Sequence, residues 1–232
     1  MSHDRRPWFV SDSGFGERLD PSDKKVFLRV CPDRTYPAGE TIFREGDPAD
    51  DLHVIARGRV KLTRTTPDGR ERIVAILGPD DLIGEAFLRE GSVYRADAVA
   101  LGDAVTCPMS RGQFQRLSLQ APTFALSFAE ILAESLFSCR DQVSADYAPI
   151  KVRVATTLLE QARRFGAPSA EDADWLELET ELRHDEIASM IGVTRVSVST
   201  SLSELRRQGL IEGTRGRYRL HAPAIEMLEL DV

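Results

Sequence analysis

The hydrophobic positions between residues 186 and 210 predict two short helices joined by a turn. The apolar residues of the first helix share one face: Ile187, Ala188 and Ile191. Those of the second helix share another face: Val198, Leu202 and Leu205. Gly192 and Gly209 end the two helices, and Thr194 is placed to cap the second by accepting from a free amide. This arrangement is a helix-turn-helix, whose second helix can lie in a DNA major groove.

The polar face of the second helix favours contact with DNA over contact with water alone. It carries short hydroxyl side chains and one arginine: Arg195, Ser197, Ser199, Thr200 and Ser203. Such side chains let a helix approach phosphates and base edges closely. An ordinary antiparallel helix pair is the alternative. Against it, residues 213–220 read as a hairpin wing around a glycine-rich turn, with Arg215, Arg217 and Arg219 placed for a phosphate backbone.

From residue 35 to residue 109 the pattern changes to short strands separated by Gly, Pro and Asp. Strands are predicted over residues 35–36, 41–43, 52–57, 59–66, 70–77, 81–82, 94–100 and 104–108. So many short strands with regular turns predict a small antiparallel barrel or roll. A short helix opening at Pro21 and running through Val30 is expected before the roll.

A single long helix is predicted from Thr123 to Ala145, because the stretch holds neither Pro nor Gly and its apolar residues recur every three or four positions. The apolar residues form two neighbouring stripes: Phe124, Phe128, Ile131, Ser135 and Ser138 in one, and Leu132, Leu136, Cys139 and Val143 in the other. One stripe is expected to pack on the roll and the other on a second subunit. Burial in a bundle within the chain is the alternative, but no other predicted helix is long enough to be its partner.

Proline disfavours the helical conformation in the residue before it, so residues 147–149 are predicted to be a hinge. Beyond it the pattern predicts a helix over 150–165, an acidic loop over 166–174, a strand over 175–180 and a helical turn or two over 224–230. The chain is thus predicted to be an α+β protein. Its parts are a mobile tail over 1–22, a sensor roll over 23–122, a dimerisation helix over 123–147 and a winged helix-turn-helix over 148–232.

Composition and charge are compatible with this picture. The net charge is −7, yet the six arginines and two glutamates between Arg195 and Arg219 leave a local charge of +4. No apolar run approaches the ~20 residues that cross a bilayer, and no secretory signal opens the chain, so a cytoplasmic protein without a membrane partner is expected.

The three cysteines are scattered, which predicts buried free thiols and no metal or iron–sulfur site. No nucleophile–base arrangement stands out, so no enzyme is expected.

A candidate anion site is formed by Gly84-Glu85 and, ten residues later, Arg95-Ala96. A glycine at the start of a short helix lets a ligand approach the free amides, and Arg95 can pair with a phosphate. Glu85 can accept from a sugar hydroxyl. A surface turn with an exposed arginine is the alternative. Asp97 shares the predicted strand face of Arg95, so the two can pair, competing with a phosphate or replacing it. Alternatively, Asp97 faces a neighbouring strand.

Together these features resemble the Crp–Fnr family of bacterial transcription regulators. The resemblance rests on YPAGETIFREGDPADDLHVIARGRVKL from Tyr36 onward, the Gly-Glu and Arg spacing, the long helix and the helix-turn-helix, in the family's order from about Leu28. It implies a cyclic-nucleotide-binding β-roll (a double-stranded β-helix or jelly roll), a dimerisation helix and a C-terminal winged helix. Family members are homodimers that bind pseudo-palindromic double-stranded DNA and usually recruit RNA polymerase.

The resemblance also implies roles for single residues. Those on ligand-binding positions are Gly84, Glu85, Arg95, Ala96, Ser138 and Cys139. Those on DNA-binding positions are Arg195, Val196, Ser197, Ser199, Thr200, Arg215 and Arg217. Arg195 matches an arginine that reads guanine, whereas Val196 and Thr200 depart from an expected glutamate and arginine. The half-site should therefore differ from that of the cAMP-binding members, because valine can contact a thymine methyl but cannot accept from cytosine.

The ligand expected from the resemblance is cAMP or a related nucleotide. Ala96 replaces a serine of the cAMP-binding members, and Ser138 and Cys139 replace a Thr-Ser pair that reaches the adenine. The iron–sulfur branch is excluded because a cysteine cluster is missing, and no axial ligand for haem is evident. The alternatives are a ligand-independent activator of the same fold and a cyclic-nucleotide adaptor that does not bind DNA. An enzyme with a cyclic-nucleotide regulatory domain is disfavoured, because the C-terminal third holds no catalytic constellation.

Overall fold

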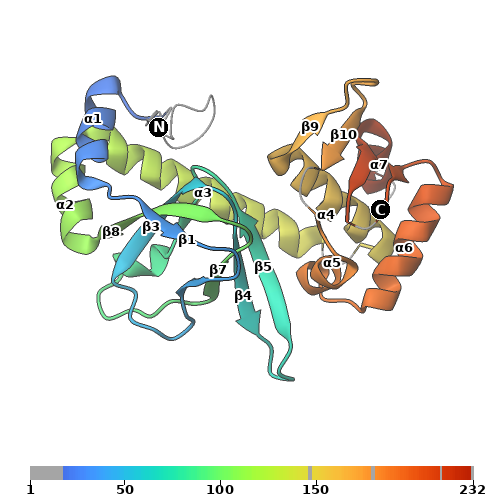
Figure 1. The fold of residues 1–232 in the computed structure, drawn as a ribbon, viewed down its shortest axis with the longest axis horizontal. Helices are drawn as coiled ribbons and strands as arrows, with labels where there is room; N and C mark the ends of the chain where they lie inside the picture. The colour runs from blue at the N-terminus through green and yellow to red at the C-terminus, as the bar shows by residue number, and fades with distance from the viewer. Residues whose placement is uncertain (1–17, 146–147, 179–180, 215, 231–232) are drawn as a thin grey trace. The chain divides into compact units, whose positions relative to one another are not determined.

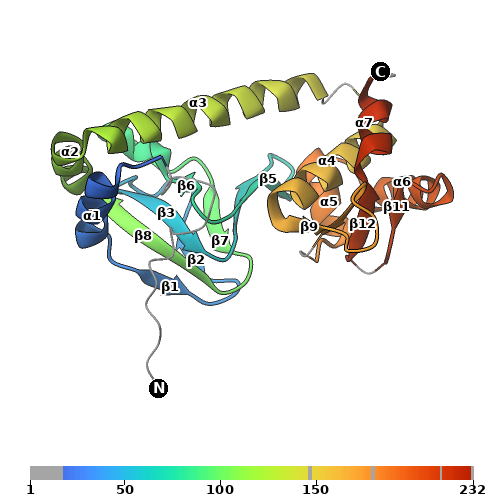
Figure 2. The same ribbon diagram turned by 90° about the horizontal axis from the view of Figure 1, so that it is seen from above.

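The computed structural model describes residues 18–145, 148–178, 181–214 and 216–230 of the 232-residue chain. The chain divides into two compact units, Met1–Phe137 and Ser138–Val232. Figure 1 and Figure 2 show the elements of each unit. The division predicted from the sequence, with boundaries at residues 22, 122 and 147, stays a prediction. None of the described helices has both the length and the apolar character needed to cross a membrane.

The first unit is a roll of two antiparallel four-stranded sheets, ordered β1-β8-β3-β6 and β2-β7-β4-β5. Its strands are β1 (Arg34–Tyr36), β2 (Thr41–Phe43), β3 (Asp51–Arg57), β4 (Val60–Thr65), β5 (Glu71–Leu77), β6 (Leu82–Ile83), β7 (Asp97–Ala100) and β8 (Ala104–Ser110). Its helices are α1 (Pro21–Val30), the 3-10 helix η1 (Glu85–Leu88), α2 (Arg111–Gln120) and the start of α3 (Pro122–Ala145). The predicted roll is confirmed.

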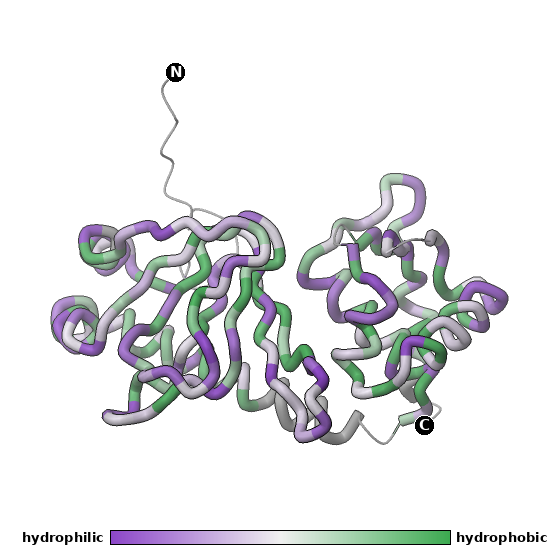
Figure 3. Tube along the Cα trace, turned by 60° about the horizontal axis from the view of Figure 1, so that its bottom comes forward, coloured by the Kyte–Doolittle hydropathy of each residue, from purple (hydrophilic) through white to green (hydrophobic). Residues whose placement is uncertain are grey.

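Strand β3 is apolar along most of its length because it is covered on both sides. Ile55 belongs to the core between the two sheets. Val54 belongs to a second core, which the helices α1, α2 and α3 close over the outer side of the β8–β3 sheet. In Figure 3 hydrophobic and hydrophilic segments alternate along the strands of the roll, as expected where each strand contributes to a core.

Helix α2 was not predicted, although its start carries a recognisable signal. Ser110 caps the helix, and Gln113 Oε1 accepts from the Ser110 backbone N–H at 2.9 Å. This Ser-x-x-Gln capping box satisfies two free amides at the helix start. The apolar pattern behind it is weak, because Phe114 and Leu117 are the main apolar contacts that α2 makes with the two cores.

The predicted long helix is confirmed as one continuous element, α3, and Figure 2 shows it running along one side of the roll with α1 and α2 at its start. Phe124 and Phe128 are buried, and Ile131 and Leu132 pack partly buried against the two cores. One stripe of α3 therefore packs on the roll, as the sequence predicts. The predicted second stripe divides, since Leu132 faces the roll whereas Leu136 is 52% exposed.

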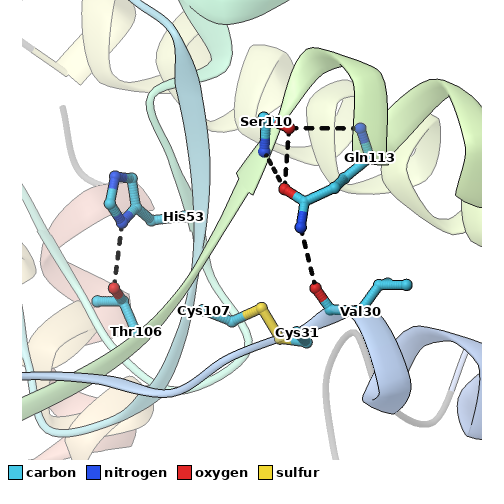
Figure 4. Close-up of a disulfide and its surroundings, with 7 residues drawn as sticks. All are labelled: Val30, Cys31, His53, Thr106, Cys107, Ser110 and Gln113. Atoms are coloured by element: carbon cyan, nitrogen blue, oxygen red, sulfur yellow. Dashed lines mark hydrogen bonds between the residues drawn. A yellow bond between two sulfur atoms is a disulfide. The ribbon is translucent and has the colours of Figure 1, made fainter.

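Cys31 and Cys107 form a disulfide, which corrects the prediction of free thiols at these two positions (Figure 4). Their Cα atoms lie 5.4 Å apart, within the usual range for a disulfide. The two residues are separated by 76 positions in the chain. The pairing could not be predicted from the sequence, because it depends on the fold, which brings the end of α1 against β8.

Among the described residues, the second unit combines four helices with a small sheet ordered β11-β12-β10-β9. Its elements are α4 (Ile150–Phe165), β9 (Gly166–Pro168), β10 (Trp175–Leu178), α5 (His184–Ile191), α6 (Arg195–Arg207), β11 (Ile211–Glu212), β12 (Tyr218–His221) and α7 (Ala222–Leu230). The loop predicted over 166–174 is partly wrong, because its first three residues form β9. Gly166 allows the close pairing of β9 with β10, since an added Cβ would lie 2.3 Å from the Glu177 carbonyl oxygen.

Buried His53 makes the stability of the roll dependent on pH. Its Nδ1 lies 3.1 Å from Thr106 Oγ1, and burial, assisted by the charge of Arg34, lowers its pKa from 6.5 to about 4. The unfolded chain binds this proton more readily, so stability is full above pH ~6.5 and falls by about 3 kcal/mol as the pH drops to ~4. Urea unfolding should show this slope, and His53→Gln should flatten it. An NMR titration of His53 near pH 6.5 in the folded protein would contradict the prediction.

Candidate functional site

Gly84 lies between β6 and η1 in a left-handed conformation, with φ 86°. An added Cβ would lie 2.8 Å from the Asp51 carbonyl oxygen and 3.0 Å from Tyr94 Cε1. Only glycine fits, because both the backbone angle and the space exclude a side chain. Glu85 follows directly as the first residue of η1, and its side chain is exposed.

Tyr94 anchors the backbone that carries Arg95, and sequence reasoning missed it. Its hydroxyl donates to the Asp51 carbonyl oxygen at 2.8 Å, and its ring stacks on Phe43 with 3.9 Å between centroids. Burial raises the pKa of Tyr94, so the hydroxyl keeps its proton and remains a donor. The Tyr94 ring also lies against Gly84, so this one side chain contacts the turn that precedes Glu85 and extends from the residue that precedes Arg95.

Arg95 and Ala96 lie in a bend, which corrects the strand predicted from residue 94 to residue 100. The strand β7 begins only at Asp97. Ala96 is buried, whereas the Arg95 side chain is exposed and makes no hydrogen bond or ion pair with any residue that the structure describes. An unpaired guanidinium can form two parallel hydrogen bonds to a phosphate.

The hypothesis that Asp97 pairs with Arg95 is wrong. Asp97 Oδ1 instead accepts a hydrogen bond of 2.7 Å from the Glu45 backbone N–H. The alternation of side chains along a strand does not apply to Arg95, because this residue precedes β7. Asp97 therefore ties the loop after β2 to the start of β7, and it neither competes with an anion at Arg95 nor replaces one.

Ser138 and Cys139 lie on α3, but their side chains are outside the described part of the structure. Their contact with a ligand stays a prediction. Among the described residues, no group of three or more His, Cys, Asp or Glu side chains is placed to hold a metal ion.

Helix α6 begins where the sequence predicts. Thr194 Oγ1 accepts from the Ser197 backbone N–H at 3.1 Å, and Gly192 ends α5 in the left-handed conformation. The buried face of α6 consists of Val198, Ser201, Leu202 and Leu205. The opposite face is exposed and consists of Arg195, Val196, Thr200 and Ser203, with Ser197 and Ser199 half-buried at its edges. A 74% exposed valine on this face has no packing role within the unit.

Two of the hydroxyls on α6 are already oriented by neighbours. Ser199 Oγ lies 2.8 Å from His184 Nδ1, and Ser197 Oγ lies 2.9 Å from Thr194 Oγ1. Burial and then the charges of Arg206 and Arg195 lower the pKa of His184, so its ring is neutral at neutral pH. Sequence reasoning missed His184, because its contact with Ser199 depends on how α5 and α6 cross.

Arg195 is positioned at the start of α6 with most of its side chain in water. Its Nε lies 3.6 Å from Asp185 Oδ1, and the two side chains are 69% and 67% exposed. An ion pair this exposed contributes little to stability. Arg195 can therefore exchange Asp185 for a stronger partner, such as a phosphate or the edge of a guanine.

The wing is a hairpin of β11 and β12, but only part of the predicted arginine cluster is free for DNA. Arg217 is 81% exposed and pairs at 3.2 Å with the exposed Glu181. Arg219 is instead held within the unit, and its guanidinium is paired with Glu212, Glu171 and Glu177. The predicted phosphate contact by Arg219 is therefore not supported. Arg215 lies outside the described residues.

Two family models match the chain and together cover both units. The cyclic nucleotide-binding domain matches residues 33–121, and the Crp-like helix-turn-helix domain matches residues 152–229. The first match spans the roll from β1 to α2, and the second spans the winged helix from α4 to α7.

Similar proteins extend over nearly the whole chain. The cyclic AMP receptor protein of Thermus thermophilus is 30% identical over 208 residues, which cover 89% of this chain and 92% of that protein. The CRP-like cAMP-activated global transcriptional regulator of Mycobacterium tuberculosis is 28% identical over 204 residues, covering 87% and 89%. Among solved structures, FixK2 from Bradyrhizobium japonicum is 26% identical with a TM-score of 0.71, covering 86% of this chain and 97% of that one.

Removal of the Thr194 side-chain cap should weaken α6. Thr194→Ala leaves a free amide at the helix start and should lower the free energy of unfolding of the second unit by about 1 kcal/mol. Thr200→Ala is the matched control, because Thr200 is exposed in the middle of the same helix and its loss should cost nothing. Urea unfolding followed by the fluorescence of Trp175, which lies in β10, measures both. Equal effects of the two substitutions would contradict the cap.

Proposed function

This chain belongs to the Crp–Fnr family of transcription regulators, and we propose that it acts as a homodimer whose roll binds cAMP or a related cyclic nucleotide and thereby controls sequence-specific DNA binding. The chain has the family's cyclic-nucleotide-binding and helix-turn-helix domains in the family's order. In this proposal it works in the cytoplasm, recognises a pseudo-palindromic operator, recruits RNA polymerase and catalyses no reaction.

The unpaired Arg95, which directly follows the tyrosine whose ring lies against Gly84, carries the ligand part of the proposal. Its guanidinium is exposed and unpaired among the described residues, and the buried Tyr94 fixes the backbone from which it extends. A cyclic phosphate can accept two charge-assisted hydrogen bonds from such a group. Glu85 directly follows the Gly84 turn, and its exposed carboxylate can accept from a ribose hydroxyl. The names of the Thermus and Mycobacterium relatives, which include cyclic AMP, support this choice of ligand.

The ligand-independent alternative has less support. It depended on Asp97 acting at Arg95 as a built-in anion, and Asp97 is bonded to the Glu45 amide instead. The arginine is thus left without an internal partner among the described residues. An exposed arginine without such a partner is available to an anion that arrives from solution.

An exposed apolar stripe on α3 supports the homodimer. Leu126 is 61% exposed and Leu136 is 52% exposed, and the exposed Ala129 and Ala133 lie between them on the same helical face. Phe124 and Phe128 on the neighbouring face are already buried against the roll. Residues at this spacing form the seam of a two-helix interface, which a second copy of α3 can cover.

The exposed residues of α6 support the proposal that this helix contacts the bases of a DNA half-site in the major groove. Arg195 stands at the helix start, where recognition helices contact base edges, and Val196 beside it can contact a thymine methyl. Arg217 in the wing is available to a phosphate, since its pair with Glu181 is exposed to water. Two such helices in a homodimer would read two half-sites about 34 Å apart.

Arg95→Ala should weaken cAMP binding by about 10- to 100-fold, because hydrogen bonds to a charged group contribute roughly 1.5–3 kcal/mol. Isothermal titration calorimetry with cAMP on the wild type and the variant measures this. Arg72→Ala is the control, since Arg72 is an exposed arginine on β5 and should bind as the wild type does. Equal heats from the wild type and Arg95→Ala would show that Arg95 does not bind the ligand. The absence of heat from all three proteins would favour the ligand-independent activator.

Arg195→Ala should weaken binding to the specific operator by about 1–3 kcal/mol and relax discrimination at one base pair. Mobility shifts on the operator and on single-base variants, at fixed salt, measure both effects. Arg207→Ala, at the far end of the same helix, should leave discrimination unchanged. Equal loss on every sequence would reassign Arg195 to a phosphate contact. No shift by the wild-type protein, with or without ligand, would favour the adaptor.

The double substitution of Leu126 and Leu136 by Glu should separate the subunits, because charges would replace the proposed apolar seam. Sedimentation equilibrium should give the mass of two chains for the wild type and one for the variant. Leu119→Glu is the control, since Leu119 is 85% exposed on α2 and lies outside the stripe. A double variant that stays dimeric would place the interface elsewhere.

A further inference from the structure

We propose that Cys31 and Cys107 are a reversible redox site, and that their disulfide fastens α1, and through α1 the first turns of α3, to the roll. Cys31 is the residue that directly follows α1, and Cys107 lies within β8 (Figure 4). The bond thus joins the end of a helix that lies over the second core to a strand in one of the two sheets. None of the proposed ligand or DNA contacts involves either residue.

The segment that ends at Cys31 holds the start of α3. The Asp23 carboxylate, buried in α1, accepts from both the backbone N–H and the Oγ1 of Thr123. One turn further along, Phe27 stacks on Phe124 with 5.8 Å between ring centroids. Before α1, the Arg18 carbonyl oxygen accepts from Ser127 Oγ at 3.0 Å. The segment from Arg18 to Phe27 therefore contacts the first two turns of α3.

Apart from the packing of Val26 and Val30 on the second core, the C-terminal end of α1 is attached to the roll chiefly by the disulfide. Near it the Val30 carbonyl oxygen accepts from Gln113 Nε2, but at 3.4 Å this hydrogen bond is long (Figure 4). Val30 itself is only partly buried. A covalent bond one residue later fixes the end of α1 much more firmly. Reduction should consequently loosen α1 and the start of α3 with it.

The chemical setting favours a reversible bond over a permanent cross-link. A protein that binds DNA in a bacterium works in the cytoplasm, where small thiols keep cysteines reduced and a disulfide is usually transient or redox-sensing. This step rests on the proposed function. The two sulfurs also differ in access, since Cys107 is fully buried among apolar side chains and Cys31 is partly exposed. Exchange with a small molecule therefore begins at Cys31.

The oxidation uses a low-molecular-weight disulfide as oxidant. The Cys31 thiolate attacks one sulfur of that disulfide, whose S–S bond breaks and releases one small thiolate. Cys107 then loses its proton and attacks the Cys31 sulfur, and the second small thiolate leaves. Two protein thiols are oxidised and one small disulfide is reduced to two thiols. Reduction by excess small thiol runs through the same mixed disulfide at Cys31.

The first experiment counts free thiols by iodoacetamide labelling and intact mass after equilibration of the full-length protein in oxidised and reduced glutathione at graded ratios. We expect three labelled thiols in reducing buffers and one, at Cys139, in oxidising buffers, with a reversible transition between them. Cys139→Ser should lose one label at every ratio and keep the two-thiol transition. One labelled thiol at every ratio would show that the disulfide is not reduced. Three labelled thiols at every ratio would show that it does not form. Either result would overturn the redox site. Neither result bears on the binding of ligand or DNA.

Hydrogen exchange tests the mechanical part of the proposal. Amides of α1 and of residues 123–128 should exchange at least tenfold faster in the reduced wild type than in the oxidised one, whereas amides of β4 and β5 should not change. Cys31→Ser should match the reduced protein under both conditions, and Cys139→Ser should respond as the wild type does. If Cys31→Ser does not fold, the oxidised and reduced wild type still give the comparison. Equal exchange in the two redox states would show that the bond does not stabilise α3.

Discussion

The packing of Phe114 between η1 and α3 is the interaction on which the arrangement of the first unit depends. Its ring makes edge contacts with Phe87 of η1 at 5.3 Å and with Phe124 and Phe128 of α3 at 5.2 and 4.9 Å. Edge-to-face aromatic pairs at these separations have a preferred geometry, so a shift of one ring alters the positions of the others. Glu85 lies two residues before Phe87, which connects the proposed ligand site to the long helix through three layers of rings.

The same packing explains why α3 can serve two partners. Its aromatic residues are concentrated in the first two turns and bury one face against the roll, while the leucines and alanines of the neighbouring face remain exposed. A ligand can shift an equilibrium between two arrangements of α3 only by its different affinity for each. In the proposed regulator, that difference would arise where η1 meets Phe114.

Local patterns in the sequence were sufficient for elements whose signals are local. The cap at Thr194, the glycine at 192 and the apolar stripe of α6 each depend on residues within a few positions of one another. The strands of the roll were found for the same reason. The helix α2 was missed because its apolar content is low, although the Ser110–Gln113 capping box was present to be read.

Contacts between distant parts of the chain could not be predicted. The disulfide joins residues 76 positions apart, and the hydrogen bond from the Glu45 backbone N–H to the Asp97 carboxylate joins residues 52 positions apart. Arg219 shows the same limit, since its spacing suggested a phosphate contact while the sheet surrounds it with carboxylates from three segments. In each case the residue type was informative, but the partner depended on the topology.

The hydrogen bond from Arg206 Nε to the Gly213 carbonyl oxygen, at 2.9 Å, ties the last turn of α6 to the first residue of the wing turn. Gly213 also lies so close to the other side of the turn that an added Cβ would lie 2.3 Å from the Arg217 carbonyl oxygen. Helix α6 and the wing hairpin should consequently move together as one rigid body. A change of operator preference during evolution would then proceed by exchange of individual side chains on α6, with the docking angle held constant.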